Sequence, residues 1–279
     1  MHLIESLSEI KQLTQKARAS GKTIGFVPTM GALHAGHLEL LHRARAENDL
    51  VCCSIFVNPI QFNNPEDYQH YPRVINEDAR QLETTGCDYL FLPAAADMYP
   101  RPIALSIHFG ALETVMEGKF RPGHFSGVAA VVSKLFHLVN PHKAYFGQKD
   151  LQQCAVVRQL VEDLNFNLEL VCHPIIREAD GLAMSSRNRR LTEPERRQAV
   201  QLYTALTLAR HWLQTKPVAD VKAAVAAYLQ DYNLIELEYF EVADAASLQP
   251  LATAASSNGL ALCIAAYLGR IRLIDNIII

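Results

Sequence analysis

The chain reads Pro28-Thr29-Met30-Gly31-Ala32-Leu33-His34-Ala35-Gly36-His37 directly after a short apolar run at residues 24–27. Apolar residues then recur at helical spacing at Leu38, Leu41 and Ala44. This order predicts a strand, a tight loop and the N-terminus of a helix. The start of a helix presents unpaired backbone N–H groups and the positive end of the helix dipole, which suit an anion such as a phosphate.

Two imidazoles stand beside this predicted loop, at His34 and His37. Each can donate a hydrogen bond to charge that develops on phosphate oxygens, and histidine titrates near neutral pH. A surface loop that happens to hold two histidines, or one half of a zinc site, would give the same short pattern. Zinc is the weaker alternative, because the six cysteines are scattered and none form the Cys-x-x-Cys spacing of a structural site.

The composition is that of an ordinary globular protein. The chain has 279 residues, of which 49% are hydrophobic and 20% are charged, enough for one large domain or two modest ones. A net charge of −3 provides no overall field for nucleic acid or an anionic membrane. No apolar run approaches the length of a membrane span, and residues 1–3 lack a signal-peptide layout. We therefore expect a cytoplasmic protein with buried free thiols and no membrane or nucleic-acid partner.

The first part of the chain alternates between strand-like and helix-like segments. Residues 51–57 form a continuous apolar run, as expected of a parallel strand that is covered on both faces. Further strands are predicted at 89–92, 143–146 and 168–172, and helices at 4–19, about 71–85, 128–139 and from about 151. Such alternation predicts an α/β domain with a Rossmann-like parallel sheet.

Polar residues follow two of these strands. Asn58 and Gln61 come after the run at 51–57, and Gly147-Gln148-Lys149-Asp150 follows the strand at 143–146. Ligands of open α/β sheets collect at the carboxyl ends of the strands, where loops carry function. A lysine ammonium acts there as a point charge for a phosphate. Taken alone, Gln61 would be a plain loop amide and Lys149 a surface lysine.

Two further polar groups are candidates for binding. Ser185-Ser186-Arg187 is a compact set of donors for phosphate oxygens, and arginine can bind them bidentately. A solvated basic loop is the simpler explanation of this segment, and nucleic-acid contact is the least favoured one. Three polar residues of the helix at 71–85 are weak candidates for metal ligands, although a solvated helix face explains them better: Glu77, Asp78 and Gln81.

The last third of the chain has a different pattern. Helices are predicted at 192–213 and 217–231, and three strand-like runs follow at 235–242, 260–267 and 271–274. Helices followed by antiparallel-looking strands suggest a small α+β domain. We place the domain boundary near residue 175, with domains at 1–175 and 176–279.

Several of these segments resemble known motifs. The pattern His-x-Gly-His after a first strand is similar to the nucleotide-binding signature of the adenylyl-transferring superfamily, which includes nucleotidylyltransferases and class I aminoacyl-tRNA synthetases. In their joint order, the motifs resemble the pantothenate synthetase family, the AMP-forming pantoate–β-alanine ligases. The segments that carry this resemblance are 28–37, 56–62, 71–73, 124–128, 147–153, 177–188 and 273–276. One departure is Gln148, where many members of the family carry glutamate.

The resemblance implies a two-step reaction. The pantoate carboxylate attacks the α-phosphorus of MgATP to give pantoyl adenylate and pyrophosphate, and the β-alanine amine then displaces AMP. The transfer needs alignment and charge neutralisation more than covalent help from the protein. The resemblance also implies a homodimer built through the first domain. Because candidate phosphate ligands lie in both predicted domains, we expect the second domain to close over ATP as a lid.

The same resemblance assigns roles to individual residues. His37, His34 and Lys149 would be the catalytic residues, with His37 as proton donor, and Gln61 and Gln153 would bind pantoate. Mg²⁺ would accompany the β- and γ-phosphates, and no protein ligand of the metal is assigned with confidence. The ATP site would be formed by Met30, Gly31, Ala32, Leu33, His34, Ala35, Gly36, His37, Gly147, Gln148, Lys149, Asp150, Ile176, Met184, Ser185, Ser186 and Arg187.

Two other functions are compatible with part of this pattern. Another adenylyl or nucleotidyl transferase would share the His-x-Gly-His loop, but the pair Gln61 and Gln153 is not expected in its substrate pocket. A catalytically silent nucleotide-binding regulator has no chemical need for the full set of His34, His37, Lys149, Ser185 and Arg187.

Overall fold

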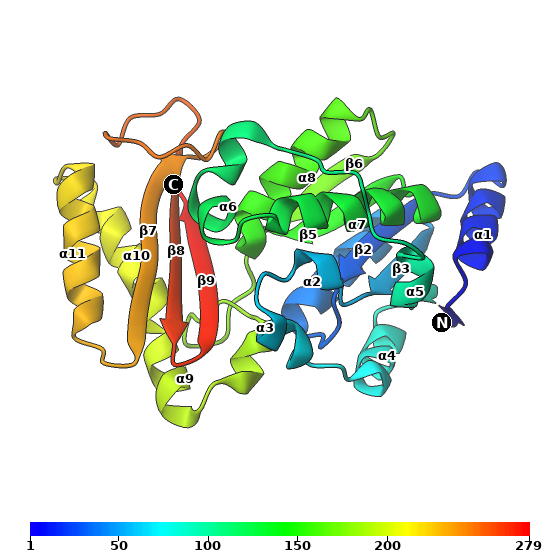
Figure 1. Cartoon of the computed structure of the whole chain (residues 1–279), viewed down its shortest axis with the longest axis horizontal. Coiled ribbons are helices and arrows are strands. Elements are labelled where there is room, and N and C mark those ends of the chain that lie inside the picture. Colours follow the sequence, from blue (N-terminus) through cyan, green and yellow to red (C-terminus); the bar gives the residue numbers. More distant parts are fainter. The chain divides into compact units, whose positions relative to one another are not determined.

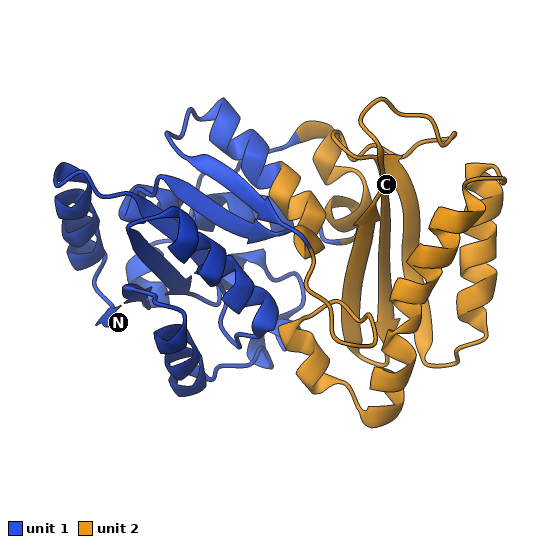
Figure 2. Ribbon diagram, turned by 180° about the vertical axis from the view of Figure 1, so that it is seen from behind, with its two compact units in different colours: residues 1–109, 121–147, 156–174 blue, residues 110–120, 148–155, 175–279 orange.

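The computed structural model describes residues 1–279, which form two compact units (Figure 2). The first unit comprises residues 1–109, 121–147 and 156–174. The second comprises residues 175–279 together with two short segments, 110–120 and 148–155. A division into functional domains at residues 175 and 176 stays a prediction.

The first unit is built on a six-stranded sheet in the order β1-β4-β3-β2-β5-β6 (Figure 1). Every neighbouring pair in this sheet is parallel, which confirms the predicted Rossmann-like architecture. The strand order reverses between β2 and β5, the kind of switch point at which open α/β sheets bind ligands. The strands are β1 (His2–Ile4), β2 (Ile24–Thr29), β3 (Leu50–Ile55), β4 (Tyr89–Phe91), β5 (Lys143–Gly147) and β6 (Glu169–His173).

Helices cover both faces of this sheet, as the continuous apolar strands require. On one face, Leu41 of α2 belongs to the same apolar cluster as Val27 of β2. Adjacent residues of a strand point to opposite faces, and Phe26 packs on the other face against Phe136 of α7. The helices that begin before residue 170 and lie wholly or partly in this unit are α1 (Leu7–Ala19), α2 (Ala35–Glu47), α3 (Pro65–Gln69), α4 (Ile75–Thr84), α5 (Ala95–Met98), α7 (His124–Val139) and α8 (Leu151–Asp163).

The first helix begins later than predicted, and a strand precedes it. Residues 2–4 form β1 and pair with β4, although periodicity favoured a helix from residue 4. Ser6 is the N-cap of α1, and its hydroxyl accepts a hydrogen bond from the backbone N–H of Glu9. This cap satisfies a backbone donor that the helix itself leaves unpaired, so it defines where the helix starts.

The second unit contains an antiparallel sheet in the order β7-β8-β9, formed by β7 (Ile235–Asp244), β8 (Leu260–Leu268) and β9 (Ile271–Ile278). Its core joins apolar residues of α10 and α11 to those of the three strands. This arrangement confirms the predicted helices and antiparallel strands of the last third of the chain. The helices are α6 (Met116–Phe120), α9 (Glu193–Ala199), α10 (Gln201–Trp212) and α11 (Val218–Gln230).

The single helix predicted over 192–213 is divided at Val200 into α9 and α10. Val200 keeps right-handed helical dihedral angles, so the chain continues in nearly helical form through the break. Thr192 and Glu195 form a capping box at the start of α9, which agrees with the predicted helix start.

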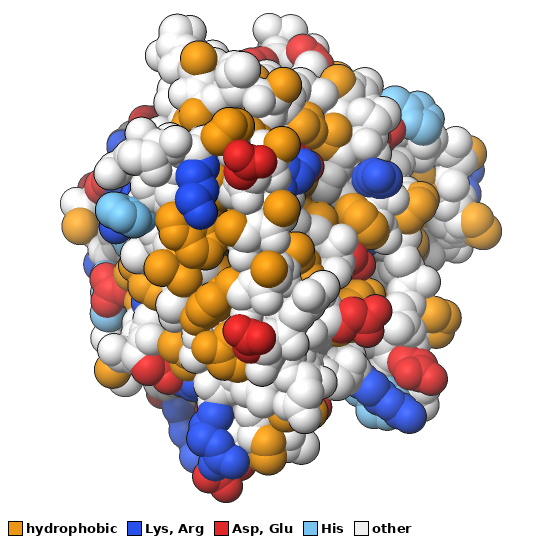
Figure 3. Space-filling view, turned by 90° about the vertical axis from the view of Figure 1, so that its left-hand side faces the viewer, with side chains coloured by type: hydrophobic (Ala, Val, Ile, Leu, Met, Phe, Trp, Pro, Cys, Tyr) orange, Lys and Arg blue, Asp and Glu red, His pale blue; other side chains and the backbone are white.

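The surface carries charges of both signs. On the face drawn in Figure 3, acidic and basic side chains are interspersed among hydrophobic atoms. This pattern agrees with the net charge of −3. None of the helices combines the length and the apolar character that crossing a bilayer would require.

Candidate active site

A buried carboxylate organises the loop that follows β2. Asp78 of α4 is 0% exposed, and its two oxygens accept hydrogen bonds from the backbone N–H groups of Ala32 and Leu33, at 2.9 and 2.7 Å. These two amides are therefore bound within the protein. An anion at this loop would be held by the start of α2 and by the two imidazoles, rather than by the amides of residues 32 and 33.

The backbone of this loop needs glycine at residue 31. Gly31 has φ of +82°, and a Cβ atom there would lie 2.9 Å from Ile55 and 3.1 Å from the Asp78 carboxylate. Ala32 follows with φ of +51°, a left-handed conformation that is uncommon for a residue with a side chain. Two consecutive left-handed residues turn the chain sharply, so that residue 34 reaches the start of α2.

The two histidines lie side by side at the N-terminus of α2, with their ring planes tilted by 35°. His34 is the N-cap residue of this helix, and its ring centroid is 4.0 Å from that of His37. Both rings are half-buried. The structure therefore places the two predicted phosphate-binding side chains together, beside the positive end of the helix dipole.

Gln61 belongs to a buried amide cluster in the same unit. It lies in the short 3₁₀ helix Pro59–Gln61 and is 8% exposed. Its Oε1 accepts a hydrogen bond from Asn58 at 2.9 Å, and its Nε2 donates to the Met30 thioether at 3.2 Å. Tyr99 donates its hydroxyl to Asn58 Oδ1, and burial raises the pKa of that phenol, which keeps the donor proton in place.

The motif at 124–128 supports this cluster from α7. His124 Nδ1 lies 2.8 Å from the backbone oxygen of Gln61, and the oxygen of Gly127 accepts a hydrogen bond from Asn58. A Cβ atom at residue 127 would lie 2.5 Å from the oxygen of Ile60, so only glycine allows this close approach. The motif at 124–128 therefore orients Gln61 through its backbone and through Asn58.

In the second unit, two predicted ATP-site residues face each other across a tight hairpin. Met184 donates its backbone N–H to the oxygen of Ile176, and Arg177 pairs with Ala183 in an isolated antiparallel bridge. Gly181 closes the turn with φ of +96°, and its missing side chain leaves room for the Tyr203 ring. The segment that follows the hairpin begins at Ser185.

The predicted Ser-Ser-Arg set forms the start of a 3₁₀ helix, Ser186–Arg190. Ser185 caps this helix by accepting a hydrogen bond from the backbone N–H of Arg187. Ser186 is buried, and Arg187 is half-buried. Glu178 in the preceding turn accepts hydrogen bonds from Asn188 and Arg196, which ties the hairpin to this helix.

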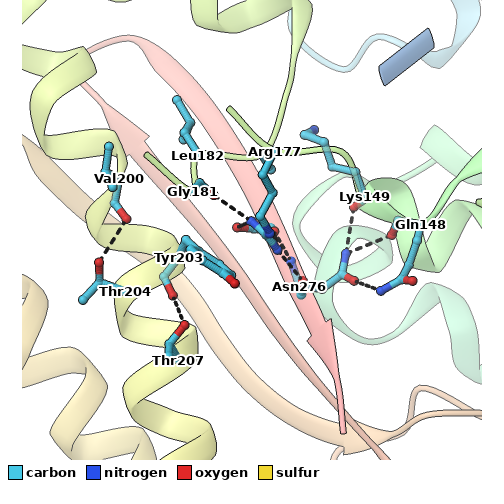
Figure 4. A network of polar contacts seen from close by, with 12 residues as sticks. Gln148, Lys149, Arg177, Gly181, Leu182, Val200, Tyr203, Thr204, Thr207 and Asn276 are labelled. Atoms are coloured by element: carbon cyan, nitrogen blue, oxygen red, sulfur yellow. Dashed lines mark hydrogen bonds and ion pairs between the residues drawn. The ribbon is translucent and has the colours of Figure 1, made fainter. Parts of the chain in front are cut away.

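Lys149 lies in another short 3₁₀ helix, Gln148–Asp150, which directly follows β5. The backbone oxygens of Gln148 and Lys149 both accept hydrogen bonds from Asn276 of β9 (Figure 4). Gln153 is half-buried in α8. Gln61 belongs to the first unit and Gln153 to the second, so their joint contact with a substrate stays a prediction.

The weak candidates for metal ligands contact other groups of the first unit, and a metal role for them stays a prediction. Asp78 binds the backbone of the histidine loop, and the amide of Gln81 lies 3.5 Å from the carboxylate of Glu77, which is exposed. No group of three or more His, Cys, Asp or Glu side chains is arranged to hold a metal ion. The six cysteines are free, as expected, and burial raises the pKa of the Cys87 and Cys263 thiols to about 12.

The fold and the site define an α/β protein of nucleotide-binding architecture, with paired histidines at the carboxyl end of a central strand. The family model described as Pantoate-beta-alanine ligase matches residues 2–278. The chain belongs to this family.

Individual members of the family are similar to this chain over nearly their full length. A pantothenate synthetase from Cytophaga hutchinsonii is 47% identical, over 99% of this chain and 98% of the relative. The solved pantothenate synthetase from Thermus thermophilus is 42% identical, with a TM-score of 0.92 and 99% of both chains covered. The ligase from Francisella tularensis, solved with β,γ ATP and β-alanine, is 36% identical, with a TM-score of 0.84 over 100% of this chain and 97% of that one.

Replacing Asp78 tests its role as the support of the histidine loop. In Asp78→Asn, one backbone N–H loses its acceptor and faces a side-chain N–H instead, so we expect the free energy of unfolding to fall by about 2 kcal/mol. Urea unfolding measures this change, and hydrogen exchange at Ala32 and Leu33 should quicken. Glu77→Gln, at the exposed neighbour, is the matched control. Unchanged stability combined with a raised Mg²⁺ requirement would instead make Asp78 a metal ligand.

Proposed function

We propose that the protein condenses pantoate with β-alanine to form pantothenate through a pantoyl-adenylate intermediate. In the first step, a pantoate carboxylate oxygen bonds to the α-phosphorus of ATP, and the bond from this phosphorus to the β-phosphate bridge breaks, releasing pyrophosphate. In the second step, the β-alanine amine bonds to the acyl carbon and AMP leaves, while the amine loses a proton. Activation is needed because a carboxylate is a poor acylating agent.

The paired histidines at the start of α2 carry this proposal. Their ring centroids are 4.0 Å apart at the carboxyl end of β2, next to the reversal of strand order. Two imidazole donors beside a helix N-terminus can neutralise charge that builds on the α-phosphate and on departing pyrophosphate. His34 and His37 would both contact phosphate oxygens, and His37 would supply the proton.

The β- and γ-phosphates of ATP would be held by residues of the second unit. Lys149 would contribute a point charge, and Ser185, Ser186 and Arg187 would donate hydrogen bonds. We propose that Mg²⁺ accompanies these phosphates and neutralises part of their charge. ATP and β-alanine as substrates are supported by the Francisella tularensis relative, which was solved with both kinds of ligand.

Gln61 is suited to bind pantoate because its neighbours hold its buried carboxamide in one orientation. Asn58 orients its oxygen, and its Nε2 donates to the thioether of Met30. Sulfur is a weak acceptor, so a substrate hydroxyl or carboxylate would replace that contact with a stronger hydrogen bond. Gln153 would supply a second amide to the same substrate.

Three properties of the whole molecule belong to the same proposal. The second domain would close over ATP as a lid, and two copies of the chain would form a homodimer through the first domain. The enzyme would act in the cytoplasm, where reducing conditions keep its six thiols free.

Pantoate-dependent exchange of labelled pyrophosphate into ATP, measured without β-alanine, tests the function. We expect exchange by the wild type that needs Mg²⁺, and a loss of about 10²–10³-fold in His37→Ala, because a transition-state hydrogen bond donor is removed. His42→Ala, on an exposed part of the same helix, is the matched control and should exchange normally.

Exchange that proceeds with another acid but not with pantoate would favour a different adenylyl transferase. Binding of ATP without any exchange would favour the silent regulator. Full exchange by His37→Ala would remove this residue from the chemistry while leaving the reaction itself in place.

Domain closure and assembly are measurable in solution. We expect the radius of gyration from small-angle X-ray scattering to fall when ATP and pantoate are added together, because the lid closes. Sedimentation should give a mass of twice 31.1 kDa for the homodimer. A radius that does not change with either ligand would contradict the lid, and a mass of one chain would contradict the dimer.

A further inference from the structure

The C-terminal strand β9 contacts two turns that carry candidate phosphate ligands, and all three segments belong to the second unit. One turn is Gln148–Asp150, which holds Lys149, and the other is Ser186–Arg190, which holds Arg187. Two adjacent residues of β9, Asp275 and Asn276, are 4% and 3% exposed. Adjacent residues of a strand point to opposite sides, so each can hold a different segment.

Asn276 fixes the turn that carries Lys149. Its Nδ2 donates to the backbone oxygens of Gln148 and Lys149, and both distances are 3.0 Å. Figure 4 shows these contacts. Backbone oxygens can only accept hydrogen bonds, so the nitrogen of the Asn276 carboxamide has to face them. The orientation of this amide is therefore determined by its surroundings, and its Oδ1 must point the other way.

The outward direction of Asn276 Oδ1 brings this oxygen to the side chain of Gln148. This oxygen needs a donor, and the Nε2 of Gln148 provides one at 3.2 Å. A glutamate at this position would be ionised near neutral pH and could only accept, so two oxygens would face each other. In this chain, the carboxamide of Gln148 therefore supplies a donor to Asn276 that a glutamate at this position would lack.

Asp275 holds the other segment through Arg177. The guanidinium donates two hydrogen bonds to the carboxylate, at 2.6 and 2.9 Å, and one each to the backbone oxygens of Gly181 and Asn276. It also lies 3.8 Å above the centroid of the Tyr203 ring. A bidentate pair that also stacks on an aromatic ring leaves arginine little freedom, so the base of the hairpin at 176–184 is fixed to β9.

We propose that Asn276 is a positioning residue for Lys149, and that Asp275 and Asn276 together set the spacing between the Lys149 turn and the segment that leads to Arg187. The inference rests on the proposed role of Lys149 in binding the phosphates of ATP. Asn276 acts through the backbone of residues 148 and 149 and touches no substrate. Gln148 completes the arrangement by donating a hydrogen bond to Asn276 Oδ1.

Calorimetric titration of the full-length protein with ATP and Mg²⁺, without pantoate, tests this inference. In Asn276→Asp, a carboxylate oxygen replaces the Nδ2 that donates to the two backbone oxygens, so we expect the Kd for ATP to rise about tenfold. Lys149→Ala should also raise the Kd. If Asn276 acts through Lys149, the double variant should bind ATP no more weakly than Lys149→Ala alone, because the positioned group is already gone.

Variants at position 148 and a control variant at a different asparagine complete the experiment. Gln148→Glu removes the donor to Asn276 Oδ1 and adds a negative charge, whereas Gln148→Met removes the donor without adding a charge. Both variants should raise the Kd several-fold, and they decide the question if Asn276→Asp does not fold. A raised Kd in Gln148→Glu alone would assign the effect to the added charge and contradict the role of this hydrogen bond. Asn258→Asp, on an exposed loop where the amide donates to Asp244, should leave the Kd unchanged. Circular dichroism verifies the fold of every variant.

Each remaining result overturns a distinct claim. Losses that add in the double variant, or unchanged affinity in both Asn276→Asp and Gln148→Glu, would show that the network is merely structural. No binding of ATP by the wild type would overturn the proposed function instead, before any variant is compared.

Discussion

The histidine loop depends on one buried interaction, the pair of hydrogen bonds from the amides of Ala32 and Leu33 to the carboxylate of Asp78. A carboxylate taken out of water is costly unless its oxygens are satisfied, and two backbone donors satisfy it here. The sharp bend of the loop is possible because Gly31 leaves room for that carboxylate. With the turn fixed, His34 caps α2 and lies against His37. The geometry on which the proposed chemistry rests thus depends on a side chain of α4, a helix outside the loop itself.

Local patterns in the sequence were sufficient to predict much of the architecture. Continuous apolar runs such as residues 51–57 identify strands buried on both faces, and the glycines and histidines of residues 31–37 mark a turn before a helix. The sheet, its helices and the antiparallel C-terminal strands were predicted for these reasons. The sequence also indicated that the two histidines lie near each other, because they are three positions apart at a helix start. The strand β1 was missed, since three residues are too few to show a period.

What the sequence did not reveal are contacts between distant segments. Asp78 lies 46 residues beyond Ala32 on a helix whose polar side reads as solvated, so its burial leaves no local pattern. Asn276 reaches the Lys149 turn across 127 residues, and the sequence marks it only through its resemblance to the family. Tyr99 and Gly127, which hold the Asn58–Gln61 cluster, are hidden in the same way. The sequence of a strand or loop indicates which of its side chains are buried. It does not indicate which distant residue forms hydrogen bonds with its remaining polar groups.

The central claim is that the protein activates a carboxylate by joining it to the α-phosphorus of ATP, and an oxygen label follows this bond directly. Pantoate with ¹⁸O in both carboxylate oxygens would be converted with ATP and β-alanine, and the products analysed by mass spectrometry. An acyl adenylate predicts one ¹⁸O in AMP, one in pantothenate and none in pyrophosphate. Unlabelled AMP, or label in a phosphate released from ATP, would mean that the carboxylate never bonds to the α-phosphorus, and would contradict the account.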